Sequence, residues 1–387
     1  MSIKFSQLSN ISTSATVAIN TLANKKRQAG KRVYNLSAGE PMIVTPEVII
    51  EAGEKAMRDG QTKYPPSTGI APLRLAASEW MNKNYYTHYD IDHTLVTCGG
   101  KFGLYLLLQA LVESDTEVLI PAPYWVSYPS MVQLFGGTPI TVNTSESDGW
   151  KIEVADLEKL FTPKTKILIF NNGSNPTGVL YSREELEKIL TWCSKKNIIA
   201  ISDEVYSGLV YDGGKYISCA SFGNLSNNVI VVHSCSKNFA MTGWRVGFVF
   251  APAEIIRVLA TLQSQSITNT SSISQWAALS ALQNAETIIP QIRTEMQKRR
   301  DTLVEVRQKL FGGNLPSPAS ALYAFWPINS FGVNDTDSVR FCEKVLKEGN
   351  VAMVPGAPFG KEGYVRISFG ETKKELTEAM EALRRYL

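Results

Sequence analysis

The sequence predicts an α/β fold built on a mostly parallel β-sheet that is covered by helices on both faces. Short apolar runs rich in β-branched residues recur through the middle of the chain, at 117–120, 139–142, 166–170, 198–201 and 229–232. Helix-like stretches separate several of these runs. One of them, 186–196, is opened by Ser182 and Glu185 at the spacing of a capping box. Strands that alternate with helices favour a parallel sheet that is buried on both sides.

A second, smaller α+β domain is predicted because the pattern changes near residue 285. A long charged helical pattern covers 287–310, an apolar strand-like run covers 321–326, and a final helix is expected at 371–387. The predicted domains are a large one over residues 46–284 and a small one formed by residues 1–45 together with 285–387.

Composition favours an enzyme that acts on a small molecule. The formal charge of +3, from 39 basic and 36 acidic residues, is too balanced for a nucleic-acid or membrane surface. The five cysteines form no C-x-x-C pair, and His88, His93 and His233 lack a ligand spacing, so we expect no disulfide framework and no metal site. These histidines are expected at the surface or at the edge of the core. The N-terminus has no apolar run typical of a signal peptide, which predicts a cytoplasmic protein.

Polar residues follow several predicted strands, at the sheet edge where α/β proteins bind ligands. Lys237 lies just beyond the run 229–232, between Ser234 and Ser236 on one side and Arg245 on the other. A partly dehydrated lysine can act as a Schiff-base nucleophile, and hydroxyl groups with an arginine suit a phosphate. Taken alone, this segment fits a solvated surface loop better.

The neighbouring predicted strand favours a ligand site over a solvated surface loop. Asp203 ends the run 198–201 with a carboxylate, which is costly at this position unless it meets a cation such as a protonated pyridine nitrogen, so we favour Asp203 over Glu204. Tyr206 follows three residues later and can donate to a phenolic oxygen of the same ring. Simple packing remains the commoner role of a tyrosine beside a sheet.

Three further strand ends add to the set. Asn175 lies in a turn-rich loop and can hold a ligand oxygen, and Trp125 offers a flat face to a ring, although core packing is the default role of a tryptophan. Gly99, Gly100 and Lys101 precede a helical run, whose first amides suit a phosphate. One ligand fits the whole set: an aromatic heterocycle with a phosphate, a ring nitrogen, a phenolic oxygen and an aldehyde.

This set of residues resembles the pyridoxal-phosphate aminotransferases of the aspartate aminotransferase family, class I and fold type I, with matching motifs from about residue 14 to residue 366. The prokaryotic aspartate aminotransferase branch is the most similar. The resemblance implies a large domain with a seven-stranded sheet, pyridoxal 5'-phosphate as cofactor, amino acids and 2-oxo acids as substrates, and a homodimer with shared active sites.

The resemblance also implies a role for each residue. Lys237 would bind the cofactor aldehyde and later act as a general base, Asp203 would pair with the ring nitrogen, and Tyr206 would bind the phenolic oxygen with Asn175. The expected phosphate ligands are Gly99, Gly100, Lys101, Ser234, Ser236 and Arg245, with Tyr64 lent to the neighbouring subunit. The expected substrate contacts are Gly39 and Arg366 for the α-carboxylate, and Trp125, Asn175, Lys101 and Thr16.

Substrate choice follows from the same resemblance. Thr16, in the stretch 13–18, and Lys101 match residues that hold a distal carboxylate, so we expect transfer from L-aspartate to 2-oxoglutarate, giving oxaloacetate and L-glutamate. Some positions depart from the family pattern, namely Met42, Ile43, Phe102, Gly103, Gly173 and Ser174. Phe102, if it lies beside the ring, favours aromatic or prephenate-like substrates.

Other functions remain open. An aromatic or prephenate aminotransferase, or a β-lyase on the same fold, would use the same Lys237, Asp203 and Arg366. A non-catalytic effector domain of a transcription regulator is a further alternative, but no helix-turn-helix or basic extension supports it.

Overall fold

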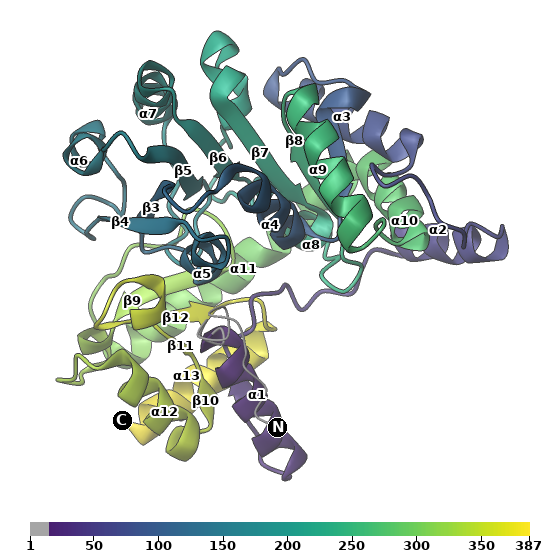
Figure 1. Cartoon of the computed structure of the whole chain (residues 1–387). Helices are drawn as coiled ribbons and strands as arrows, with labels where there is room; N and C mark the ends of the chain where they lie inside the picture. Colours follow the sequence, from purple (N-terminus) through teal and green to yellow (C-terminus); the bar gives the residue numbers. More distant parts are fainter. Residues whose placement is uncertain (1–14) are drawn as a thin grey trace, which may run out of the picture.

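Seven strands form one large sheet in a computed structural model that describes residues 15–387, and their order is β2-β8-β7-β6-β5-β3-β4 (Figure 1). The strands are β2 (Thr94–Thr97), β3 (Glu117–Ala122), β4 (Thr138–Asn143), β5 (Thr165–Asn171), β6 (Ile199–Asp203), β7 (Val229–Ser234) and β8 (Gly247–Phe250). Only β8 runs against its neighbours, β7 and β2. The predicted mostly parallel sheet of seven strands is therefore confirmed.

Alternating side chains of each strand feed two hydrophobic clusters, one on each face of this sheet. On β5, Ile167 and Ile169 belong to one cluster, and Leu168 and Phe170 belong to the other. The first face is covered by α4 (Gly100–Leu111), α5 (Ser127–Leu134) and α9 (Ala253–Ser266). The second face is covered by α3 (Ala71–Tyr85), α6 (Val154–Leu160), α7 (Arg183–Lys196) and α10 (Ser272–Gln283). Burial on both faces explains why the strands are continuous apolar runs in the sequence.

A smaller group of elements lies below the large sheet in Figure 1. A three-stranded antiparallel sheet has the order β11-β12-β9, with β9 (Tyr323–Pro327), β11 (Val354–Pro355) and β12 (Tyr364–Ser368). A parallel pair joins β1 (Tyr34–Asn35) to β10 (Val351–Ala352). The helices here are α1 (Ala15–Gln28), α11 (Ala285–Phe311), α12 (Ser338–Gly349) and α13 (Lys373–Tyr386).

Segments from the two ends of the chain thus lie side by side in this smaller group. Helix α1 packs against β10 and β11, and the long α11 packs against α13. The two remaining helices are α2 (Glu47–Arg58), which packs on α10, and the short α8 (Cys235–Asn238). The domain boundaries given above stay a prediction, and residues 1–14 lie outside the described part of the chain.

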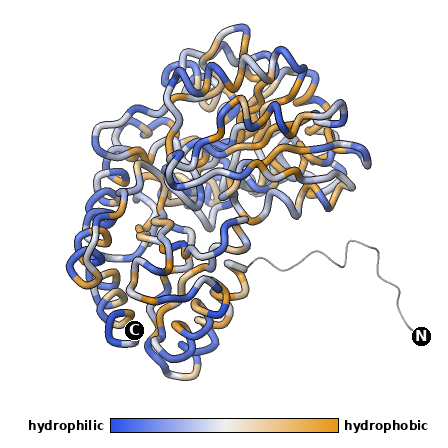
Figure 2. Tube along the Cα trace, turned by 90° about the vertical axis from the view of Figure 1, so that its left-hand side faces the viewer, coloured by the Kyte–Doolittle hydropathy of each residue, from blue (hydrophilic) through white to orange (hydrophobic). Residues whose placement is uncertain are grey.

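Hydrophobic positions concentrate along the strands inside the upper part of the molecule, whereas outward-facing helix positions are hydrophilic (Figure 2). Over residues 15–387, no helix combines the length and the apolar character that crossing a membrane would need.

The predicted start of helix α7 agrees with the structure better than the predicted start of strand β9 does. Ser182 Oγ accepts a hydrogen bond from Glu185 N at 3.3 Å, and Glu185 Oε2 accepts one from Ser182 N at 2.6 Å, so the capping box of α7 is confirmed. The strand expected at 321–326 begins only at Tyr323, after Ala321 adopts a left-handed backbone with φ 65°.

The expectation for His233 is wrong, because its side chain is buried at 3% exposure within β7. One ring nitrogen lies 2.7 Å from Ser207 Oγ, and burial lowers the pKa of the imidazole to about 3. The histidine is therefore a neutral core residue.

Gly247 of β8 should not tolerate a side chain. A Cβ atom there would lie 2.5 Å from the carbonyl carbon of Gly99 and would also collide with the amide nitrogen of Gly100, and backbone atoms cannot rotate away. We expect Gly247→Ala to lower the free energy of unfolding by about 1–3 kcal/mol, as overpacking usually does. Urea titration measures this, with Gly243→Ala as control, because a Cβ at Gly243 meets nothing within 4 Å. Equal stability of the two variants would contradict the prediction.

Candidate active site

A cavity of about 280 Å³ lies where the carboxyl ends of β5, β6 and β7 face strands β9 and β12 of the small sheet. Most of the predicted site residues line it, namely Thr16, Gly39, Gly100, Lys101, Trp125, Asn175, Asp203, Tyr206, Ser234, Ser236, Lys237, Arg245 and Arg366. Gly99 does not line the cavity, but it precedes the first residue of α4. Tyr64 is 88% exposed and lies outside the cavity.

Lys237 sits in α8, directly after β7, and its ammonium donates a hydrogen bond to the carbonyl oxygen of Gly39. Dehydration in the cavity lowers the pKa of Lys237 to about 8, and the nearby charges of Arg366 and Arg245 act in the same direction. Glu40 and Asp203 oppose this shift. An amine with such a pKa is neutral in a large fraction of molecules near pH 8, which a nucleophilic lysine requires.

Asp203 is the last residue of β6 and is buried at 6% exposure. Its carboxylate accepts hydrogen bonds from Tyr128 Oη at 2.7 Å and from Val205 N at 3.3 Å. Burial raises the pKa of Asp203 to about 6, while these donors and the charge of Lys237 partly lower it again. Since a carboxylate can accept about four hydrogen bonds, Asp203 keeps capacity for a cationic donor in the cavity.

Hydrogen-bond donors without acidic partners gather at the start of α4. Ser234 Oγ and Ser236 Oγ are 2.8 Å apart, and Arg245 uses Nη1 to bind the Thr242 carbonyl oxygen at 2.9 Å. A Cβ atom at Gly99 would collide with the Arg245 guanidinium, so this glycine permits the close approach. Within residues 15–387, no carboxylate forms a salt bridge with Arg245. Such a donor set, with a helix N-terminus, suits a phosphate dianion.

Arg366 projects from β12 and is only 2% exposed. Its guanidinium donates to Asn175 Oδ1 at 3.1 Å and to the Ser37 carbonyl oxygen at 2.7 Å, and no partner for its Nε occurs in the described part of the chain. Burial lowers the pKa of Arg366. A buried guanidinium without a carboxylate partner is costly, so an anionic ligand would offset this cost.

The comparisons with known proteins agree with this geometry. A model of the family "Aminotransferase class I and II" matches residues 31–383. The chain belongs to this family. A probable aspartate/prephenate aminotransferase of Aquifex aeolicus is 36% identical over 99% of this chain and 98% of its own length. The aspartate aminotransferase of Bacillus subtilis is 35% identical, with 98% of each chain covered. The chain is thus an aminotransferase, and the resemblance inferred from its motifs is confirmed.

Solved structures confirm the fold of this aminotransferase. The aspartate aminotransferase from Thermus thermophilus with maleate superimposes with a TM-score of 0.94, at 35% identity and with both chains fully covered. The aromatic aminotransferase from Pyrococcus horikoshii gives a TM-score of 0.87 at 37% identity, covering 94% of this chain and 98% of its own.

Tyr128, Asn171 and Tyr323 are among the cavity residues of the aminotransferase that were not predicted from the sequence. Tyr128 donates to Asp203, Asn171 accepts a hydrogen bond from Asn175 N at 2.7 Å, and Tyr323 Oη lies 2.8 Å from Tyr206 Oη. Tyr128 could have been found, because it lies three residues after Trp125 at helical spacing. No local signal marks Tyr323, which is 117 residues from Tyr206.

The condition for the expected effect of Phe102 on specificity is not met in the cavity as the structure describes it. Phe102 is not among the residues that line the cavity of the aminotransferase, and its ring stacks on Tyr105 with centroids 5.8 Å apart. The position of Phe102 thus gives no support to aromatic substrates, and the choice of substrate stays a prediction.

The lowered pKa of Lys237 can be measured in the cofactor-free aminotransferase. We expect acetylation of Lys237 by acetic anhydride, followed by mass spectrometry against pH, to have a midpoint near 8, whereas an exposed lysine of a peptide titrates near about 10.4. Asp203→Asn should move the midpoint further down, because the charge of Asp203 raises the pKa of Lys237. A midpoint above about 10 in the unsubstituted protein would refute the dehydrated environment.

Proposed function

We propose that the chain is a pyridoxal 5'-phosphate-dependent aminotransferase that transfers the amino group of L-aspartate to 2-oxoglutarate, giving oxaloacetate and L-glutamate. The observation that carries the proposal is one cavity in which three groups converge: a lysine of lowered pKa, a buried aspartate, and a buried arginine that has no acidic partner within residues 15–387. No single one of these groups is diagnostic, but each suits a different part of the cofactor and the substrate.

The residues of the cavity fit the proposed cofactor. Ser234, Ser236, Arg245 and the first amides of α4 would hold its phosphate, and Asp203 would hold its ring nitrogen. Trp125 would stack on the ring, while Tyr206 and Asn175 would contact its phenolic oxygen. When bound, pyridoxal phosphate supplies an electron sink for the electrons left behind when the substrate Cα loses its proton.

The chain's own residues would manage binding and proton transfer. Arg366 would bind the α-carboxylate with its planar fork, and the Gly39 amide would add a further donor. Lys237 would take the proton from the substrate Cα at its Nζ, which suits a base with a pKa of about 8. Transfer in two half-reactions predicts ping-pong kinetics.

An acidic substrate is supported by Lys101, whose ammonium lies 4.8 Å from the centre of the Trp125 ring at the edge of the cavity. Partial dehydration and the neighbouring charge of Arg245 lower the pKa of Lys101. Thr16 lines the same cavity and would assist Lys101 in holding a distal carboxylate. The names of the relatives, aspartate and aspartate/prephenate aminotransferase, support the same class of substrate.

A homodimer is part of the proposal. Tyr64 is 88% exposed, so its side chain is free to contact a second copy of the chain. Tyr64 would reach the phosphate site of that copy. The cytoplasmic location also stays a prediction.

The proposal is tested by adding L-aspartate, without any 2-oxo acid, to the protein loaded with pyridoxal phosphate. We expect the visible absorption band of the bound cofactor to disappear while an equal amount of oxaloacetate forms. Lys237→Ala should abolish both changes, because the variant lacks the amine that binds the cofactor and moves the proton. A band that ignores aspartate but responds to phenylalanine would select the aromatic alternative, and pyruvate with ammonia from cysteine would select the β-lyase.

Lys101→Met tests the distal carboxylate site. Losing one charge-assisted hydrogen bond should lower kcat/KM for aspartate roughly 10- to 100-fold while changing kcat/KM for alanine less than about threefold. Lys188→Met is a matched control, because Lys188 is exposed on α7 and does not line the cavity. Equal losses for both substrates would contradict the role of Lys101.

A further inference from the structure

We propose that Tyr323 is a positioning residue that directs the single hydroxyl proton of Tyr206 toward the cofactor and at the same time supports the guanidinium of Arg366. This role rests on the proposed function. It is assigned to a residue that was not predicted from the sequence. Three independent contacts of Tyr323 carry it.

The first contact is set by strand register. Tyr323 of β9 pairs with Ser368 of β12, and Phe325 pairs with Arg366, so Tyr323 and Arg366 are diagonal neighbours on one face of the small sheet. The Cζ atom of Arg366 lies 4.2 Å from the centre of the Tyr323 ring and 5.2 Å from that of Phe359. The guanidinium is thus held between two aromatic rings, which stabilises a buried cation.

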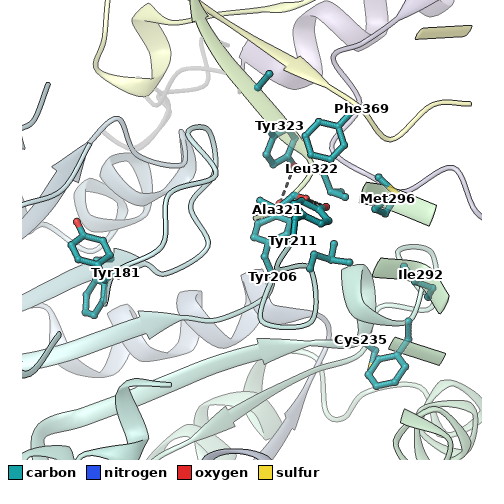
Figure 3. Close-up of a cluster of buried hydrophobic side chains, with 14 of the residues drawn as sticks. Tyr181, Tyr206, Tyr211, Cys235, Ile292, Met296, Ala321, Leu322, Tyr323 and Phe369 are labelled. Atoms are coloured by element: carbon teal, nitrogen blue, oxygen red, sulfur yellow. Dashed lines mark hydrogen bonds between the residues drawn. The ribbon is translucent and has the colours of Figure 1, made fainter. Parts of the chain in front are cut away.

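The second contact joins the two hydroxyl groups. Tyr206 Oη and Tyr323 Oη are 2.8 Å apart, with ring centroids 5.9 Å apart in an edge-to-face arrangement (Figure 3). Both side chains are nearly fully buried, at 3% and 2% exposure. Within the described residues, Tyr323 Oη has no other hydrogen-bond partner.

The third contact involves the backbone next to Lys237. A Cβ atom at Gly39 would lie 2.5 Å from Tyr323 Oη, so the hydroxyl lies directly against the segment whose carbonyl oxygen accepts from Lys237. Tyr323 therefore touches the lysine-binding backbone, the arginine and the second tyrosine at once.

A proton count gives the direction of the hydrogen bond. Burial raises the pKa of Tyr206 well above its usual value; the hydrogen bond with Tyr323 and the charge of Asp203 add to this, and Arg366 opposes it. Tyr206 therefore keeps its one proton. If that proton goes to the phenolic oxygen of the cofactor, Tyr323 must donate to Tyr206, and a phenol that receives a hydrogen bond becomes a stronger donor itself.

The test is a pH titration of the visible absorption of the protein loaded with pyridoxal phosphate, in the absence of substrate. In Tyr323→Phe, Tyr206 loses its incoming hydrogen bond and stabilises the ionised phenolic oxygen less. We expect the spectral midpoint to rise by about 0.3–0.7 pH units. Tyr206→Phe should raise it further, and the double variant should match Tyr206→Phe, because Tyr323 acts through Tyr206.

Two more variants separate this role from packing. Tyr211→Phe removes a buried hydroxyl from the same cluster (Figure 3), but that hydroxyl bonds the Ala321 carbonyl and does not line the cavity, so the midpoint should equal that of the unsubstituted protein. Tyr323→Phe keeps the ring over Arg366 and should leave KM for aspartate within about twofold. Tyr323→Leu also removes the ring and should raise KM roughly 5- to 30-fold.

Failure of the positioning role of Tyr323 and failure of the proposed function give different results in this experiment. If the unsubstituted protein binds pyridoxal phosphate without a visible band, the proposed function fails. If the band is present and shifts in Tyr206→Phe but not in Tyr323→Phe, the positioning role is refuted and the proposed function stands. A shift of equal size in Tyr211→Phe would also refute it, because the effect would then be one of packing.

Discussion

The arrangement of the active site depends on charges that are removed from water without being paired with one another. Lys237, Asp203 and Arg366 line one cavity, yet among the described residues none of them forms a salt bridge. Neutral groups hold them instead: the Gly39 carbonyl holds the lysine, Tyr128 holds the aspartate, and Asn175 with the Ser37 carbonyl holds the arginine. Their pKa values shift accordingly, and a bound ligand can supply the missing counter-charges.

The placement of the site residues on two sheets fits the absence of salt bridges between these charges in the described part of the chain. The large sheet delivers Asp203 and the segment of Lys237 from the ends of adjacent strands β6 and β7, while β12 of the small sheet delivers Arg366 from the opposite wall. Arg366 therefore faces Asp203 and Lys237 across the cavity and forms no salt bridge with Asp203 among the described residues. Separation onto another sheet keeps both groups available to a ligand that lies between them.

The sequence was informative where chemistry follows an apolar strand within a few residues. Asp203, Ser234 and Lys237 were found because each lies at or just beyond the end of a buried run, and the structure places all three in the cavity. Strand β8 was not among the predicted runs, and it is the strand that runs antiparallel to both of its neighbours. Tyr323 was missed because its contacts depend on the register between β9 and β12, which no local pattern contains.

The charges of the cavity also bear on the choice between the alternatives. Its cationic groups are Lys101, Lys237, Arg245 and Arg366, against the buried carboxylate of Asp203. In the proposed function, a phosphate would satisfy Arg245 and an α-carboxylate would satisfy Arg366, which would leave Lys101 on the face of Trp125. A neutral aromatic amino acid would leave this ammonium without a counter-charge, whereas aspartate, glutamate and prephenate each carry a second carboxylate. Aspartate and prephenate are thus equivalent in charge although they differ in shape. The charge distribution therefore disfavours the neutral amino acids, because a neutral side chain offers the Lys101 ammonium no counter-charge.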